Sequence, residues 1–145
     1  MERNEIIERL QQAVANTYEL YFMTLNGHWN LECKEFISIH EMLENQYETH
    51  AKTGDALAER IRLMGLRVAT SLKIFAAKST LRPFSEEAGR DEILQNLVEA
   101  NESMVLSSRA LSKIAQEAGD EGLVDLLGGI IRQHEVFIWK LRSHL

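Results

Sequence analysis

The sequence predicts an all-α fold of four long helices in a single domain spanning residues 1–145. Three observations support this. The chain has one Pro and eight Gly in 145 residues, and both residue types interrupt helices. Apolar residues recur at helical spacing in four long segments, and no segment alternates as a strand would. With 45% apolar and 26% charged residues, the chain has the composition of a globular protein with one core.

The first two helices are expected from Arg3 to Trp29 and from Cys33 to Met64. Gly65 suits the position just after the second helix, because glycine adopts the left-handed conformation that ends many helices. Gly54 lies inside the second helix, where glycine costs about 1 kcal/mol relative to Ala. It either allows close approach of another backbone in a dimer contact or has no particular role.

A long connection from Leu66 to Ser85 follows, with a short helical piece expected at Ser71–Ala77. The third long helix then begins at Ser85 or Arg90 and ends at Glu117. Asp120 is the expected N-cap of a last helix that ends near Arg142. Short, long and short links between four helices are typical of an up–down bundle with one crossover, the ferritin-like arrangement.

Charge and composition exclude several classes of protein. The formal net charge of −6 argues against a nucleic-acid-binding surface. No apolar segment approaches the length of a membrane span, and the charged N-terminus lacks the apolar region of a secretory signal. Cys33 is the only cysteine, so no intrachain disulfide can form, and a cytoplasmic location is expected.

Five metal-ligating side chains suggest a site divided between two molecules: His28, His40, Glu44, Asp55 and Glu59. Imidazole and carboxylate together suit iron, manganese or zinc. The last four form two pairs at i, i+4 spacing on one helix face, but the pairs are about 22 Å apart along the axis. Two antiparallel copies of the helix around a two-fold axis would bring the pair of one chain against the other pair of its partner, giving two sites per dimer.

A simpler interpretation stays open. Polar residues at i, i+4 spacing are common on helices, and Asp55 with Glu59 could be a solvated surface pair. A site closed within one chain is not expected, because no Glu is followed three residues later by His, as in ordinary di-iron bundles.

Segments along the whole chain resemble the Dps family, the DNA-binding proteins from starved cells, or mini-ferritins. The segments are His28-Trp29-Asn30, residues 40–44 (HEMLE), Asp55 with Ala58-Glu59-Arg60, Gly65, Asp125-Leu126-Leu127 and Phe137-Ile138-Trp139. The resemblance implies a hollow shell of twelve subunits with ferroxidase centres at two-fold interfaces. It implies that ferrous iron is oxidised there by hydrogen peroxide or oxygen, in the family preferentially by hydrogen peroxide, and stored as ferric mineral.

The family's ligands carry over residue by residue. His28 and His40 match its histidines, and Asp55 and Glu59 match the acidic pair contributed by the partner chain. Glu44 stands where most members have Asp, so its side chain is one methylene longer.

The resemblance also implies roles outside the ligand set. Trp29 resembles a tryptophan beside the centre that absorbs oxidising equivalents, although it could equally be a packed aromatic at a helix end. Three acids resemble those lining the family's three-fold pores for iron: Asp120, Glu121 and Asp125. The alternative for these is an N-cap and a solvated first turn. His50 and His134 match no ligand position and are expected to be structural or exposed.

The resemblance also implies DNA binding, because many members of the family coat DNA. The negative net charge of this chain argues against it. The first twelve residues form no basic tail, because they hold two arginines against three glutamates: Arg3 and Arg9 against Glu2, Glu5 and Glu8. Twelve copies of a negatively charged chain would repel a polyanion.

Three functions therefore compete. The first is a ferroxidase and iron store that protects against oxidative damage. The second is a nucleoid-associated DNA-binding structural protein with incidental metal binding, which DNA retardation without iron oxidation would favour. The third is a zinc-binding or purely structural oligomer, which metal analysis and an iron-oxidation assay would distinguish from the first.

Overall fold

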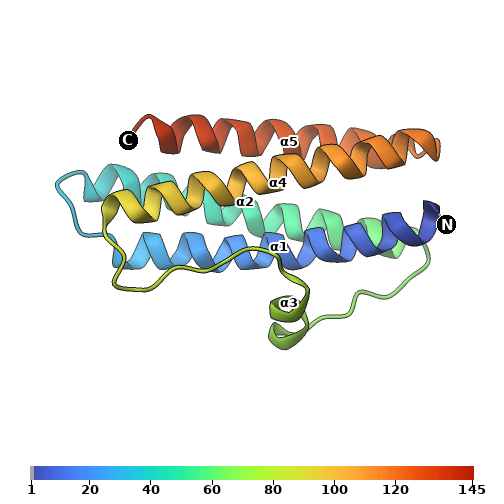
Figure 1. The fold of residues 1–145 in the computed structure, drawn as a ribbon, viewed down its shortest axis with the longest axis horizontal. Helices are drawn as coiled ribbons and strands as arrows, with labels where there is room; N and C mark the ends of the chain where they lie inside the picture. Colours follow the sequence, from blue (N-terminus) through green and yellow to red (C-terminus); the bar gives the residue numbers. More distant parts are fainter. Residues whose placement is uncertain (1) are drawn as a thin grey trace.

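A computed structural model describes residues 2–145, which form five α-helices and no strand. The four long helices are α1 (Glu2–Asn30), α2 (Phe36–Leu63), α4 (Arg90–Glu117) and α5 (Glu121–Arg142), and the short one is α3 (Leu72–Lys78). The long helices lie side by side in one elongated bundle (Figure 1). This confirms the predicted all-α, ferritin-like four-helix bundle.

The connections set the direction of each helix. A short turn makes α1 and α2 antiparallel, and another does the same for α4 and α5 (Figure 1). Between them, the crossover runs back along the length of the bundle, so α2 and α4 point the same way. The crossover carries α3, which packs against α1. The short helix begins at the N-cap Ser71, whose side chain accepts a hydrogen bond from the backbone N–H of Ile74.

Glycine follows two of the long helices, at Gly65 as the sequence predicts and also at Gly119. Gly65 and Gly119 have positive φ angles of 86° and 72°, which favour glycine. After Gly65, the N–H of Leu66 donates to the carbonyl of Ile61, which satisfies a carbonyl at the helix end. The start of α2 differs from the prediction. It begins at Phe36 rather than Cys33, because residues 33–35 form a turn in which the Phe36 N–H donates to the Cys33 carbonyl.

The apolar core is divided into two clusters along the bundle. Each of the four long helices contributes to both clusters. One cluster contains Leu20, Leu43, Leu97 and Leu141, and the other contains Leu10, Leu57, Leu111 and Leu123. Buried polar side chains occupy the intervening stretch of α2, α4 and α5: Gln46, His50, Asn101 and His134. A polar layer of this kind is unexpected in a bundle core, because an unpaired polar group costs free energy when buried.

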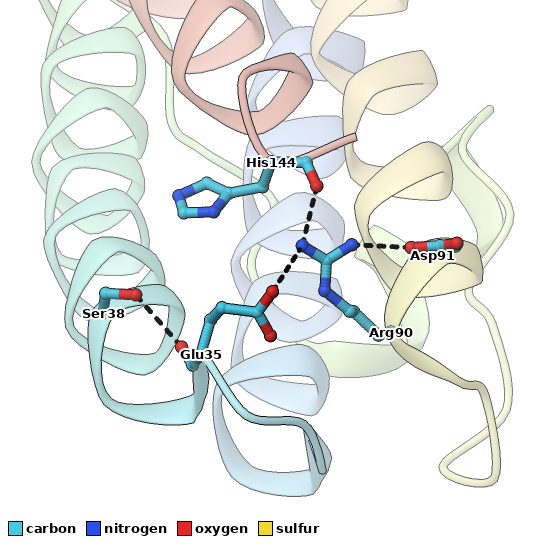
Figure 2. Close-up of polar contacts among 5 residues, drawn as sticks. All are labelled: Glu35, Ser38, Arg90, Asp91 and His144. Atoms are coloured by element: carbon cyan, nitrogen blue, oxygen red, sulfur yellow. Dashed lines mark hydrogen bonds and ion pairs between the residues drawn. The ribbon is translucent and has the colours of Figure 1, made fainter.

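Arg90 ties three parts of the chain together at one end of the bundle (Figure 2). Its guanidinium donates to the backbone carbonyl of His144 at 2.7 Å and to the Asp91 carboxylate at 2.7 Å, and it pairs with Glu35 at 3.4 Å. The start of α4, the turn before α2 and the C-terminal end are thereby joined. None of the described helices is both long and apolar enough to cross a membrane.

Candidate metal centre

His28 and His40 hold each other in place by reciprocal hydrogen bonds. His28 Nδ1 lies 2.8 Å from the backbone carbonyl of His40, and His40 Nδ1 lies 2.7 Å from the carbonyl of His28. A carbonyl can only accept, so each Nδ1 carries a proton, and the lone pair of the neutral ring is on Nε2. The rings stack with centres 3.7 Å apart and planes 10° from parallel. Backbone carbonyls commonly orient metal-binding histidines in this way.

Aromatic side chains enclose the two imidazoles. Phe36 stacks on His40 at 4.7 Å between ring centres, and Tyr47 meets His28 edge-on at 5.1 Å. His28 is buried, with 5% of its surface exposed. This packing limits rotation of both rings, so the pair is preorganised without any metal.

Asp55 and Glu59 form the second group, one turn apart on the exposed side of α2. A hydrogen bond with Asp55 raises the pKa of Glu59, and repulsion from the Asp55 carboxylate raises it further. Two carboxylates one turn apart can bind a cation together, because its charge relieves their repulsion. Burial is the largest cause of a raised pKa of Tyr18, and the negative charge of Asp55 is the second.

Glu44 lies on the exposed surface of α2, one turn after His40. Burial is the largest cause of the raised pKa of Tyr47, and the negative charge of Glu44 is the second. Glu44 therefore lies close to the ring that covers His28. Trp29, next to His28, has 67% of its surface exposed. Both placements are compatible with the predicted roles, which stay predictions.

The structure brings His28 to His40 and Asp55 to Glu59, but it does not bring these groups together within one chain. Among residues 2–145, no three His, Cys, Asp or Glu side chains are grouped closely enough to hold a metal. His40 and Asp55, one from each half-site, lie fifteen positions apart on α2, about 22 Å along the helix axis. One chain therefore supplies two incomplete halves.

Gly54 is explained within the chain rather than by a dimer contact. A Cβ atom at this position would lie 2.8 Å from the Tyr18 ring, too close for real atoms. The missing side chain makes room for Tyr18, which also stacks on Phe75 of α3 at 5.2 Å. This accounts for the glycine without the close approach of a second backbone.

The three acids at the start of α5 differ in their surroundings. Asp120 accepts a hydrogen bond from the N–H of Leu123 as the N-cap and pairs with the guanidinium of Arg60. Its charge is thus compensated inside the chain. Glu121 and Asp125 are exposed. A role for all three in a pore stays a prediction, with Asp120 already engaged in holding the helix end.

Sequence reasoning did not find the buried pair of His50 and His134. Their surfaces are 1% and 2% exposed, and the ring centres lie 5.7 Å apart. The two residues are on different helices, α2 and α5. No local spacing relates them, so only the packing of the bundle reveals the pair.

Comparison with known proteins agrees with this fold. Residues 7–145 match the ferritin family, described as a ferritin-like domain. The chain is 32% identical to DNA protection during starvation protein 2 from Bacillus anthracis, over 97% of each chain. A Dps protein from Bacillus brevis superposes with a TM-score of 0.94 at 25% identity, covering 99% of this chain and 96% of that one.

A Dps protein from Vibrio cholerae O1 superposes with a TM-score of 0.92 at 27% identity, covering 98% of this chain and 89% of that one. The family match spans nearly the whole chain, and the Bacillus anthracis relative matches it end to end. The chain therefore belongs to the ferritin-like family and, within it, to the Dps proteins.

Proposed function

We propose that two copies of the chain complete a ferroxidase centre across a two-fold axis. His28, His40 and Glu44 of one chain would face Asp55 and Glu59 of its mate. The observation that carries this is the reciprocal bonding of His28 and His40, which places the lone pair of each neutral ring on Nε2. The Vibrio cholerae relative is described as one of the ferritin-like diiron-carboxylate proteins, which supports iron as the substrate.

The ligand types suit the oxidation of ferrous iron. Neutral imidazole binds ferrous iron well, and carboxylates stabilise the ferric product because they bring negative charge. Two ferrous ions give one electron each to hydrogen peroxide, which takes up two protons and yields two waters. This consumes both reagents that would otherwise form hydroxyl radicals. Asp55 and Glu59 would bind the metal as ionised carboxylates.

We further propose that twelve chains assemble into a closed shell that stores the ferric product as mineral. Each centre needs two chains, so a monomer would be inactive. Glu121 and Asp125, both exposed, would help to draw cations to pores in this shell. Native mass measurement at micromolar concentration should show the dodecamer, and a stable monomer would contradict the proposal.

Complementation between two defective chains tests the divided centre. One chain carries His28→Ala and His40→Ala, and the other carries Asp55→Ala and Glu59→Ala. Each homo-oligomer should oxidise ferrous iron slowly, because both centres of every dimer lose half of their ligands. In a mixed dimer, both defects fall on one centre and the other is intact. Co-assembled shells should therefore recover activity, approaching half of wild type if mixed pairs predominate.

The control is a mixture of the same two homo-oligomers without dissociation and reassembly, which should stay inactive. Co-assembly is verified by native mass. If verified mixed shells show no recovery of peroxide-driven iron oxidation, the centre is not divided as proposed. Zinc retention without any iron oxidation by the wild-type protein would instead favour a structural metal site.

Several relatives are called DNA protection during starvation proteins, which makes DNA protection the second function to consider. We propose that this chain protects by removing iron and peroxide rather than by coating DNA. Both arginines near the N-terminus are engaged within the chain. Arg3 donates to the carbonyl of Met64 at 2.7 Å, and Arg9 pairs with Glu5 at 3.2 Å.

A further inference from the structure

The polar layer in the bundle core contains two imidazoles and two amides from three helices. Gln46 and His50 lie one turn apart on α2, Asn101 is on α4 and His134 is on α5. Each has 2% or less of its surface exposed. The candidate ferroxidase centre uses none of these residues.

Asn101 fixes the protonation pattern of His134. The Asn101 amide nitrogen donates to the Leu97 carbonyl at 2.8 Å, which turns its oxygen toward His134. That oxygen lies 2.8 Å from His134 Nδ1 and can only accept, so Nδ1 carries the proton. The lone pair of neutral His134 is therefore on Nε2. This is the arrangement in which a second residue orients a histidine to bind a metal.

His50 and Gln46 lack partners for their polar atoms. Both ring nitrogens of His50, and both the oxygen and the nitrogen of the Gln46 amide, are buried without a hydrogen bond among residues 2–145. Buried polar atoms in proteins are almost always satisfied, and each exception needs an explanation. A bound ion would satisfy the one nitrogen lone pair of neutral His50 and the Gln46 oxygen.

The spacing of the two imidazoles suits a shared ion. Their ring centres are 5.7 Å apart, and their planes are 20° from parallel. Two imidazole nitrogens bonded to one metal at about 2 Å hold their ring centres roughly 5–6 Å apart. Phe137 packs edge-on against His50 at 5.4 Å between centres and closes the apolar side of the layer.

The surroundings decide which ion fits. Burial lowers the pKa of both imidazoles, so the rings are neutral and protons compete weakly for their lone pairs. No carboxylate belongs to the layer, so nothing offsets the charge of a bound cation. The desolvation free energy of a buried ion rises with the square of its charge, so it is about four times smaller for a monovalent ion than for a divalent one. Among metals that imidazole binds well, copper has a monovalent state.

We propose that each chain holds a cuprous ion inside the bundle between His50 and His134, with Gln46 as an auxiliary oxygen ligand. This site is separate from the interchain centre and does not rest on the function proposed above. It differs from carboxylate-rich bundle sites because all of its ligands are neutral.

Anaerobic copper titration tests the site. Cuprous ion is supplied from a chelator of known affinity, and bound copper is counted per chain at equilibrium. The background chain carries Cys33→Ser and His40→Ala, which remove the thiol and weaken the stacked histidine pair as competing ligands. This chain should bind one copper per chain. His50→Gln or His134→Gln should weaken that binding at least 100-fold. His144→Gln, which removes a histidine outside the layer, should leave it unchanged.

X-ray absorption provides a second measurement in case a variant fails to fold. The background protein loaded with one copper should show two imidazole nitrogens as ligands and no sulfur. Unchanged copper affinity in both His50→Gln and His134→Gln, or a sulfur ligand in the loaded protein, would overturn the proposal. Displacement of cuprous ion by an equal concentration of zinc would overturn the choice of a monovalent ion.

Discussion

At the scale of single residues, the two carboxylates proposed to bind metal, Asp55 and Glu59, lower the stability of the metal-free fold. A hydrogen bond with Asp55, and then repulsion from its carboxylate, raise the pKa of Glu59 above its usual value of 4.5. A carboxyl whose pKa is raised on folding is more easily ionised in the unfolded chain. Above both pKa values the pair therefore lowers the free energy of unfolding, and this effect fades as the pH falls toward 4.5.

Asp55→Asn should consequently raise the melting temperature of the metal-free protein at pH 7.5 while weakening ferrous iron binding at least tenfold. The gain in melting temperature should shrink at pH 5, where Glu59 is more often protonated in wild type. Calorimetry and anaerobic iron titration measure the two effects. Glu41→Gln, on the exposed surface of the same helix, should change neither. A lower melting temperature for metal-free Asp55→Asn would contradict the repulsion argument.

Residue types and spacing predicted the candidate ligands, but not how they are held. His28 and His40 were expected to serve one centre, yet nothing in the sequence indicates that each bonds to the backbone carbonyl of the other. That contact forms across the turn between α1 and α2 and depends on the packing of both helices. The sequence does not indicate that His50 and His134 meet in the core, because a lone histidine carries no local signal.

At the scale of helices, the ends followed local rules and were predicted well. Gly65 and Gly119 have the positive φ angles that glycine supplies, and Asp120 caps α5 as expected. The start of α2 was misplaced by three residues. Its N-cap, Glu35, makes no side-chain capping hydrogen bond, so the sequence there offers no clear start signal.

Gly54→Ala should destabilise the protein although Ala is the better helix former. Helix propensity alone would add about 1 kcal/mol of stability. The new methyl group, however, would lie 2.8 Å from the Tyr18 ring, and crowding of this kind costs about 1–3 kcal/mol. Chemical denaturation should show a net loss, and Tyr18→Leu in the same chain should relieve it.

Gly129→Ala in α5 is the matched control, because its nearest neighbour is the flexible end of Arg132 at 3.9 Å. It should be neutral or stabilising. Equal stabilisation by both alanines would show that Tyr18 does not occupy the space beside Gly54.

At the scale of the whole molecule, the buried histidines should make the bundle sensitive to acid. Burial lowers the pKa of His134 to about 4, and burial together with the nearby His134 lowers that of His50. The unfolded chain then binds more protons as the pH drops below the usual value of 6.5. Stability should be constant above that pH and fall between 6.5 and 4. His134 alone should account for at most about 3 kcal/mol of the loss.

Denaturation of the metal-free protein at pH 7.5, 6 and 5 measures this dependence. His134→Leu leaves Asn101 without its partner and costs stability at every pH, so the slope rather than the absolute stability is the readout. The variant should lose less stability between pH 7.5 and 5 than wild type, whereas His144→Ala should follow wild type. Identical slopes for His134→Leu and wild type would show that His134 is not buried in a neutral form.

The assembled particle should not retard duplex DNA at neutral pH and physiological salt. Each chain carries a formal charge of −6, and the proposed shell of twelve chains would multiply that charge. Arg3 and Arg9, the basic residues in the first turns of α1, bond within their own chain. Contacts to phosphate release counterions and would be strongest at low salt, so the experiment should compare two salt concentrations.

Replacing three acids near the N-terminus by Lys, as Glu2→Lys, Glu5→Lys and Glu8→Lys in one variant, provides the positive control. Glu2, Glu5 and Glu8 are all exposed at the start of α1, so the fold should tolerate the change. The variant should retard DNA at low salt and lose that binding as salt rises, whereas the wild-type protein should not bind under either condition. Wild-type retardation at physiological salt and neutral pH would mean that a surface other than the N-terminal region recognises DNA despite the net charge.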